Sequence, residues 1–152
     1  MRGHSVLAVI GILLLGLGLS AAGTTAGIGV GVDPTGIYMF SAIVELPIGD
    51  NLDLRAEGGF ATGDLAGLLL ASGTILYHRP FPSVDPFIGL GLGGALTPPP
   101  FTTGLVLEGV AGVRIFPFDS LTVFVQVRYL ARFTGIGWTS GPVYEGGIGI
   151  RF

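Results

Sequence analysis

The segment that decides the fold is the last of the chain, Tyr144-Glu145-Gly146-Gly147-Ile148-Gly149-Ile150-Arg151-Phe152. In a β-strand, successive side chains point to opposite faces. Read with this period of two, one face of the segment is apolar and holds Tyr144, Ile148, Ile150 and Phe152. The opposite face holds Glu145 and Arg151, with glycines between them. The segment is therefore predicted to be a strand with one apolar and one charged face.

The same alternation occurs in seven earlier segments, which are separated by clusters of Gly, Pro, Asp and Asn typical of turns. The predicted strands span about 25–32, 37–46, 52–60, 68–78, 87–93, 105–115, 121–133 and 144–152. No segment after residue 22 has the pattern of a helix. Strands joined in sequence order by short connections favour antiparallel neighbours, and eight strands suffice to close a small barrel. The predicted fold class is an all-β, eight-stranded, antiparallel up-and-down β-barrel.

The composition separates this chain from ordinary soluble domains. Charged residues make up 11% of its 152 residues and hydrophobic residues 49%, whereas soluble domains average about 25% charged residues. Because the chain has no cysteine, it has neither disulfides nor a thiolate metal site. The net charge of −3 and the lack of any basic run argue against binding to nucleic acid.

The N-terminal segment reads as an export signal. Arg2 and His4 give a short positive start, an apolar run extends from Ser5 to Leu19, and the small residues Ser20-Ala21-Ala22 suit cleavage. The alternative is a membrane anchor, but the run is shorter than the roughly 20 residues that span a bilayer. We expect a signal peptide over residues 1–22 and a barrel domain over 23–152.

The alternation leaves open which face of the barrel points outward. A soluble barrel of the lipocalin kind keeps its apolar face inside, whereas a membrane barrel reverses this arrangement. The charged face is too sparse and too rich in glycine to be a solvent-exposed coat, and glycines would leave room inside for long charged side chains. Its charges also balance, as a buried network of ion pairs requires. The predicted interior network comprises Glu45, Asp53, Arg55, Glu57, Glu108, Arg114, Arg128, Arg132, Glu145 and Arg151.

Aromatic residues lie towards the ends of the predicted strands, where the interfacial girdles of membrane barrels belong. They are Tyr38, Phe60, Tyr77, Phe87, Phe116, Phe133, Tyr144 and Phe152. Their position favours the membrane orientation, with the apolar face towards lipid.

These strands, the predicted signal peptide and the terminal pattern Tyr144…Ile148-x-Ile150-x-Phe152 resemble small outer-membrane β-barrel proteins of the OmpX and OmpA-barrel type. The resemblance covers roughly residues 24–152 and implies the outer membrane of a Gram-negative-type (diderm) bacterium, in contact with its lipid. It also implies that Tyr144, Ile148, Ile150 and Phe152 form the interface and assembly signal that the barrel assembly machinery reads.

The resemblance further implies a topology in which both termini lie in the periplasm. The connections at 33–36, 61–67, 95–103 and 133–142 then face outward, and those at 47–51, 79–86 and 117–120 face the periplasm. The outward connections are short for this family, which argues against a role that rests on a large extracellular surface.

No catalytic, metal or cofactor site is predicted. His78 invites comparison with a Ser/His/acid set, but Ser72 is six residues away, roughly 20 Å along an extended strand. A histidine at a turn or interface explains it better. Asp53 and Glu57 could serve as an acid/base pair, yet a structural ion pair with Arg55 or Arg128 explains them better.

The leading hypothesis for function is therefore a non-enzymatic outer-membrane barrel with a structural or surface-interaction role and a polar, ion-paired interior. Three alternatives remain open: a small pore for water or ions, a lipid-modifying outer-membrane enzyme, and a soluble lipocalin-like binder.

Overall fold

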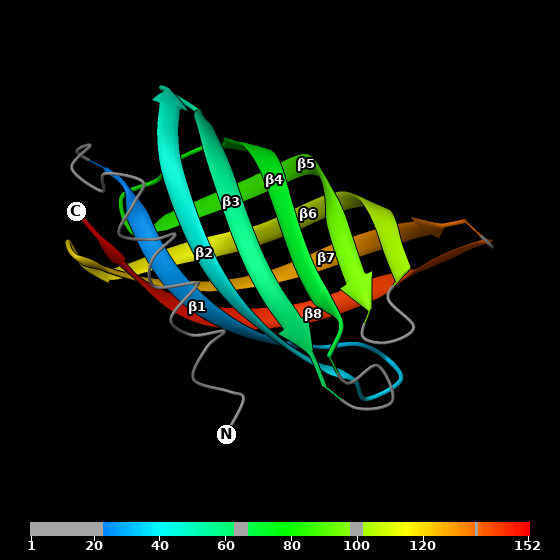
Figure 1. The fold of residues 1–152 in the computed structure, drawn as a ribbon. Helices are drawn as coiled ribbons and strands as arrows, with labels where there is room; N and C mark the ends of the chain where they lie inside the picture. Colours follow the sequence, from blue (N-terminus) through cyan, green and yellow to red (C-terminus); the bar gives the residue numbers. More distant parts are fainter. Residues whose placement is uncertain (1–22, 63–66, 98–101, 136) are drawn as a thin grey trace.

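The computed structural model describes residues 23–62, 67–97, 102–135 and 137–152, which form a closed antiparallel barrel (Figure 1). Its strands are β1 (Thr25–Val32), β2 (Tyr38–Gly49), β3 (Leu52–Ala61), β4 (Leu69–His78), β5 (Val84–Thr97), β6 (Thr102–Phe118), β7 (Leu121–Thr134) and β8 (Gly137–Arg151). Each strand pairs with its neighbours in sequence, and β8 pairs with β1 to close the barrel. The predicted fold class is confirmed.

No helix among the described residues is long and apolar enough to cross a membrane.

The barrel has two distinct ends. At the turn end lie the short β2–β3, β4–β5 and β6–β7 connections, together with Gly23 and Phe152, whose backbones are joined by a 2.7 Å hydrogen bond from the Gly23 amide to the Phe152 carbonyl. At the loop end lie the β1–β2, β3–β4, β5–β6 and β7–β8 connections. Because neighbouring strands run in opposite directions, successive connections alternate between the turn end and the loop end.

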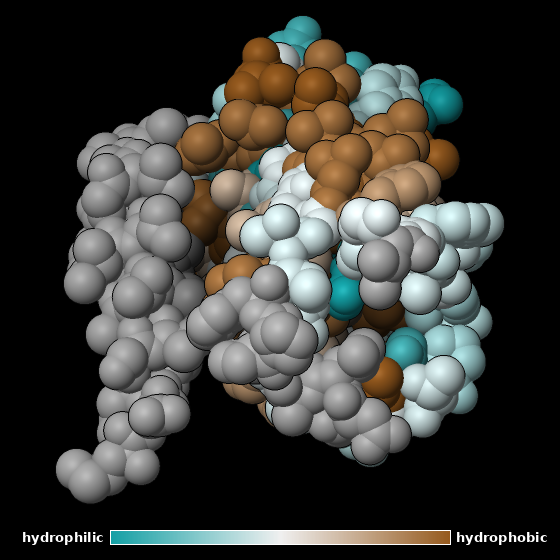
Figure 2. All heavy atoms as spheres, turned by 45° about the vertical axis from the view of Figure 1, so that its right-hand side comes forward, coloured by the Kyte–Doolittle hydropathy of each residue, from teal (hydrophilic) through white to brown (hydrophobic). Residues whose placement is uncertain are grey.

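The apolar faces of the strands point outward and the charged faces point inward. Outward side chains on different strands are widely exposed, as in Ile28 (62%), Leu90 (77%) and Ile148 (54%). In the view of Figure 2, apolar side chains gather over the upper part of the outer surface. Inward side chains such as Arg55 and Arg128 are at most 2% exposed. This orientation is that of a membrane barrel, and the soluble lipocalin-like alternative, which needs the opposite orientation, is wrong.

Several predicted connections are in fact strand. The turn expected at 79–86 ends early, because β5 begins at Val84. The loop expected at 133–142 is wrong, because β7 and β8 continue to the pair Thr134↔Gly137 and include Pro142 opposite Tyr129. The loop expected at 95–103 shrinks likewise, since β5 reaches Thr97 and β6 starts at Thr102. Glycine and proline mark turns in isolated segments, but here a paired neighbouring strand keeps them extended.

Two prolines mark irregularities at the turn end. β2 continues past Pro47 and β6 past Pro117, with register shifts between Pro47 and Gly49 and between Ile115 and Phe118. Proline lacks the amide hydrogen that a regular ladder needs, so it occurs in sheets at edges and bulges. The turns predicted at 47–51 and 117–120 are therefore shorter than expected.

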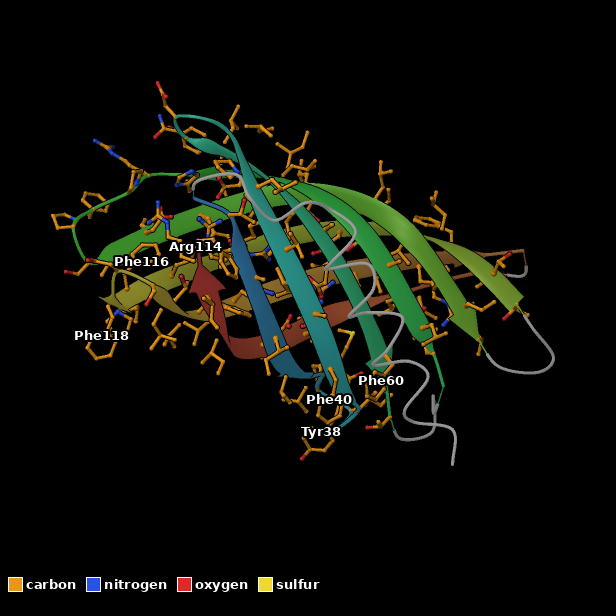
Figure 3. The ribbon with its side chains drawn as sticks, turned by 60° about the vertical axis from the view of Figure 1, so that its left-hand side comes forward. Tyr38, Phe40, Phe60, Arg114, Phe116 and Phe118 are labelled. Atoms are coloured by element: carbon orange, nitrogen blue, oxygen red, sulfur yellow. The ribbon has the colours of Figure 1, made fainter. Side chains whose placement is uncertain are left out.

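Aromatic residues gather at both ends of the barrel, as Figure 3 shows with Tyr38, Phe40 and Phe60 at one end and Phe118 at the other. The Phe40 and Phe60 rings stack with centroids 5.2 Å apart. Phe87, however, is 5% exposed and lies inside the barrel, so its prediction as a girdle residue is wrong.

Candidate functional site: the charged interior

The interior of the barrel is built by the inward positions of all eight strands, with glycines such as Gly29 on β1. Because the side chains alternate, each strand contributes every second residue to the interior. Charged and polar side chains occupy these positions at mid-height and towards the turn end, and they form two connected groups, here called the central cluster and the turn-end cluster.

The central cluster is organised around Arg128 on β7. Its guanidinium contacts three carboxylates from three other strands: Glu57 on β3, Glu108 on β6 and Glu145 on β8. The pair with Glu108 is bidentate, with both distances at 3.1 Å, and Glu145 Oε2 lies 3.3 Å from Nη1. One cation thus links four strands across the interior, an arrangement suited to the planar guanidinium fork.

Two neutral side chains extend this cluster. Gln126 accepts a 2.6 Å hydrogen bond from Arg55 Nη1 and donates a 2.8 Å bond to Glu145 Oε2. Ser41 on β2 donates a hydrogen bond to the other oxygen of Glu145. Through Gln126, the central cluster is connected to Arg55 and hence to the turn-end cluster.

The turn-end cluster is organised around Arg114 on β6. Its guanidinium lies 2.8 Å from Asp53, 2.9 Å from Asp85 and 3.2 Å from Glu45. Arg55 reaches the other oxygen of Glu45 with distances of 2.8 and 2.6 Å. Glu45 therefore joins the two arginines.

His78 and Phe87 complete the turn-end cluster. His78 lies between the two aspartates, with Nδ1 3.1 Å from Asp85 and Nε2 3.5 Å from Asp53. The Phe87 ring contacts two guanidinium groups, with Arg55 5.0 Å and Arg114 4.9 Å from its centroid. These cation–π contacts explain why an aromatic ring is stable inside a polar interior.

Towards the loop end, the interior becomes apolar. A cluster of Ala61, Leu68, Ala95 and Val106 is at most 6% exposed, with Ile37, Leu70 and Leu130 packed against it. This apolar cluster closes the interior above the central cluster. The described part of the barrel is therefore filled at two levels, by ion pairs and by hydrocarbon.

Towards the turn end, by contrast, the interior opens into a cavity of about 470 Å³, here called the vestibule. Its floor is formed by buried members of the turn-end cluster, and its rim by exposed residues of the turns and strand ends. The ionisable lining residues are Glu45, Asp50, Asp53, His78, Asp85, Arg114, Asp119 and Arg151.

Of the ten residues predicted to form the interior network, the structure brings eight into the two clusters. Arg132 and Arg151 lie apart from them: Arg132 donates a 3.3 Å hydrogen bond to Thr97, and Arg151 is exposed, with its guanidinium 5.7 Å from the centroid of the Phe116 ring. Phe116 lines the vestibule, so its assignment to an outer girdle is also wrong.

Five members of the clusters are absent from the predicted interior network: Ser41, His78, Asp85, Phe87 and Gln126. Asp85 was assigned to a turn because of the prolines around it. Asp85 lies two positions before Phe87 and therefore on the same face of a strand, which indicates that the strand begins before Phe87. As a result, the predicted balance of charge is wrong: the two clusters hold six carboxylates and three arginines.

The residues of the predicted terminal pattern lie on the outer face. Tyr144, Ile148, Ile150 and Phe152 are each more than half exposed. Tyr144 lies midway along β8, whereas Phe152 directly follows its end at the turn end.

Within the described residues, no group of three or more His, Cys, Asp or Glu side chains is arranged to hold a metal ion. His78 and Ser72 lie on the same strand, and the contacts of His78 are with carboxylates. The geometry of the clusters is that of an ion-paired core.

No protein-family model and no curated protein sequence matches the chain. Solved structures are similar in fold. The N-terminal β-barrel domain of Pseudomonas aeruginosa OprF matches with a TM-score of 0.70 at 13% identity, over 85% of this chain and 96% of that domain. Neisserial surface protein A matches with a TM-score of 0.62 at 15% identity, over 85% of this chain and 94% of that one.

The outer-membrane enzyme PagL matches with a TM-score of 0.57 at 14% identity, over 84% of this chain and 98% of that one. The chain therefore has the fold of small eight-stranded outer-membrane β-barrels, as the sequence predicted. Because the fold is common to an enzyme and to other surface proteins, it leaves the specific role open.

Proposed function

We propose that the protein is an integral outer-membrane β-barrel of a Gram-negative-type bacterium, with a structural or surface-interaction role and no enzymatic activity. The observation that carries the proposal is the orientation of the strands. Their apolar side chains, such as Leu90 and Ile88, are exposed on the outside, and their ion-paired carboxylates lie inside. A soluble protein does not expose a continuous apolar surface of this kind. In lipid, a closed barrel also satisfies the backbone hydrogen bonds of every strand, because it has no free edge.

In this proposal, residues 1–22 are a signal peptide that is removed, and residues 23–152 are the membrane domain. The turn end faces the periplasm and the loop end faces the cell exterior. The partners are outer-membrane lipid along the apolar face and the barrel assembly machinery at the last strand, through Tyr144, Ile148, Ile150 and Phe152.

Fractionation and gel migration test the proposal directly. The protein should be found in the outer-membrane fraction and should change its migration on SDS gels after heating, because an intact barrel resists SDS until it is boiled. Recovery of the folded protein in a detergent-free soluble fraction would overturn the proposal.

The absence of enzymatic activity is supported by the chemistry of the interior. His78 lies between two aspartates that both contact Arg114. Ser72 lies further along the barrel, opposite Glu57 and Gly93 in the strand ladders. Because an enzyme shares the fold, expression in a lipid-profiled strain is the relevant test. Unchanged lipid A and phospholipid profiles are expected, and a specific change would establish the enzymatic alternative.

A small pore is the second candidate, favoured by the polar interior and by the vestibule at the turn end. The filled central cluster and the apolar cluster at the loop end favour a closed barrel instead. Single-channel recordings of the wild type and Arg128→Ala in planar bilayers separate the two. Silence of both supports the closed barrel, and discrete conductance of the wild type would establish the pore.

A further inference from the structure

The outer face of β6, β7 and β8 carries a shallow hollow, here called the outer groove. Its volume is about 560 Å³, within the range of small-molecule sites in proteins. Two rows of outward side chains line it across the three strands: Ala111, Val127 and Tyr144 form one row, and Val113, Val125 and Gly146 form the other. The groove is therefore part of the apolar surface that faces lipid in the proposed function.

Residue size produces the hollow. Ala111 on β6 and Gly146 on β8 are small, whereas the side chains beside them are large and stand out from the surface. Ile88, opposite Ala111 on β5, is 61% exposed, and Ile148, on the same face of β8 as Gly146, is 54% exposed. A Cβ atom at Gly146 would meet nothing closer than 3.7 Å, so the packing of the barrel does not require glycine there. Glycine inside a strand often marks a place where a ligand approaches the backbone closely.

Tyr144 supplies one polar atom at the side of the groove nearer the loop end. It pairs with Val32, the last residue of β1 at the loop end. Among the described residues its hydroxyl makes no hydrogen bond, whereas the Tyr129 hydroxyl lies 2.9 Å from Ser140 Oγ. An unpaired hydroxyl in hydrocarbon costs free energy. The Tyr144 hydroxyl is therefore placed to donate a hydrogen bond to a molecule that lies in the groove.

The groove offers no charge to an occupant. Its outward residues are uncharged, and Gln126 and Glu145, which also border it, turn their side chains into the central cluster. The arginines of the described chain lie in the interior or at the turn end. Anionic phosphate groups in proteins are bound mainly by arginine and lysine. The occupant that fits is therefore apolar over most of its length, with one hydrogen-bond acceptor and no unpaired negative charge at the groove.

We infer that the outer groove binds one acyl chain of a zwitterionic diacyl phospholipid. The ester carbonyl of the lipid accepts a hydrogen bond from the Tyr144 hydroxyl, and the chain runs past Ala111 and Gly146 towards the turn end. The inference rests on the proposed function, because only a barrel in a membrane presents this face to lipid. It adds a preferred lipid position to a surface that otherwise contacts lipid without preference.

The test titrates the purified protein, folded in detergent, with dimyristoylphosphatidylcholine. Native mass spectrometry counts the lipids bound to each barrel, and two-dimensional NMR of the backbone amides locates them. One phospholipid should bind in preference to further copies and should shift resonances of β6, β7 and β8. The ether-linked analogue, which has the same headgroup and chain length but no ester carbonyl, should bind about two- to tenfold more weakly, as expected for one hydrogen bond. Equal binding of the two lipids, or shifts spread evenly over the barrel, would overturn the inference.

Variants locate the site. Tyr144→Phe should abolish the difference between the ester and ether lipids, and Gly146→Leu should abolish the preferred site by filling the groove. The matched control is Gly73→Leu, which places the same side chain on the outer face of β4, where a Cβ atom would meet nothing within 4 Å. Heat-dependent gel migration checks that each variant folds, and Tyr144→Phe decides the matter if Gly146→Leu does not. Preferred binding that survives in folded Gly146→Leu, or is lost equally in Gly73→Leu, would overturn the inference.

Failure of this inference and failure of the proposed function give different results. A heat-modifiable protein of the outer membrane that binds no phospholipid in preference contradicts the groove alone. Lipid-free dimers that Gly146→Leu dissociates would assign the groove to a second copy of the chain and would also overturn the inference. Recovery of the folded protein in a detergent-free soluble fraction would overturn both proposals.

Discussion

Arg128 is the side chain on which the interior depends most. It contacts three buried carboxylates, from Glu57, Glu108 and Glu145, that belong to three other strands. Removing one partner of a buried ion pair leaves uncompensated charge, which is strongly destabilising even where the intact pair contributes little.

Arg128→Ala should therefore lower the free energy of unfolding by about 3–5 kcal/mol. Urea unfolding in lipid vesicles, followed by the fluorescence of the single tryptophan, Trp138, measures the loss. The control is Arg132→Ala on the same strand, which removes one 3.3 Å contact to Thr97 and should cost at most about 1 kcal/mol. Similar losses in the two variants would contradict the central role of Arg128.

Glycines facing the interior make room for the charged side chains, as the sequence suggested. A Cβ atom at Gly29 would collide with the carboxylate of Glu145 and the hydroxyl of Ser41, whereas one at Gly73, which faces outward, would meet nothing within 4 Å. Glycine is therefore needed for space at the interior position of Gly29, whereas the outward position of Gly73 has room for a larger residue.

We expect Gly29→Ala to destabilise the barrel by about 1–3 kcal/mol, the usual cost of overpacking a filled interior. Gly73→Ala should change the stability by no more than about 0.5 kcal/mol. Both variants can be compared by urea unfolding in vesicles. A neutral Gly29→Ala would show that the interior is loosely packed.

At the scale of elements, the β1–β2 turn is held by one carboxylate. Asp33 Oδ1 accepts hydrogen bonds from the Thr35 amide at 2.8 Å, the Thr35 hydroxyl at 2.7 Å and the Ile37 amide at 2.9 Å. Slight burial tends to raise the pKa of Asp33, but hydrogen bonds from Thr35, Ile37 and Gly36 outweigh it and lower the pKa below its ordinary value.

Because the folded-state pKa of Asp33 is lowered, its contribution to stability is present above the unfolded-state pKa of about 4. The contribution is lost as the pH falls through the folded-state pKa. The wild type should thus lose a small increment of stability on acidification that Asp33→Asn, which cannot ionise, does not lose. Parallel pH profiles of the two proteins would contradict this assignment.

The last strand closes the barrel through its final residue as well as through its ladder. The Phe152 amide donates a 2.9 Å hydrogen bond to Thr24 O, and its carbonyl accepts one from Gly23. The side chain itself is 57% exposed on the outside. Deletion of Phe152 therefore removes backbone bonds and the aromatic ring together.

Deletion of Phe152 should lower the amount of folded, heat-modifiable protein in the outer membrane while leaving export across the inner membrane unchanged. Phe152→Ala keeps the backbone bonds and isolates the ring, and it should show the same direction of change if the ring is read during assembly. Phe118→Ala, another exposed aromatic at the turn end (69%), is the control. Equal loss in both substitutions would indicate a general interfacial effect.

At the scale of the whole molecule, the outer surface and the interior are chemically inverted relative to a soluble domain. Leu90 lies near the middle of β5 and is 77% exposed. In a bilayer it faces hydrocarbon, whereas in water a charge at such a position would be harmless.

Leu90→Arg should therefore cost about 2–4 kcal/mol of folding free energy in lipid vesicles. Phe81→Arg, at an exposed position in the β4–β5 turn, should cost about 1 kcal/mol or less, because the cost declines towards the interface. A neutral Leu90→Arg would contradict a membrane location for this face.

The sequence by itself determined the number of strands, their order and which residues of each strand share a face. These features follow from a local period of two, which segments such as 52–60 and 144–152 display without reference to the rest of the chain. The strand ends were less predictable, because Pro86 and Pro142 lie in ladders with a neighbouring strand rather than in turns.

Only the tertiary structure decided which interior side chains meet. Arg55 contacts Gln126 and Arg128 contacts Glu57 across 71 positions of sequence, and the stagger of the closed barrel sets the level of each residue. That stagger leaves Arg132 and Arg151 outside the clusters and brings in Asp85, His78 and Phe87. The period of two specifies the face of a side chain, but its height in the barrel depends on how all eight strands are paired.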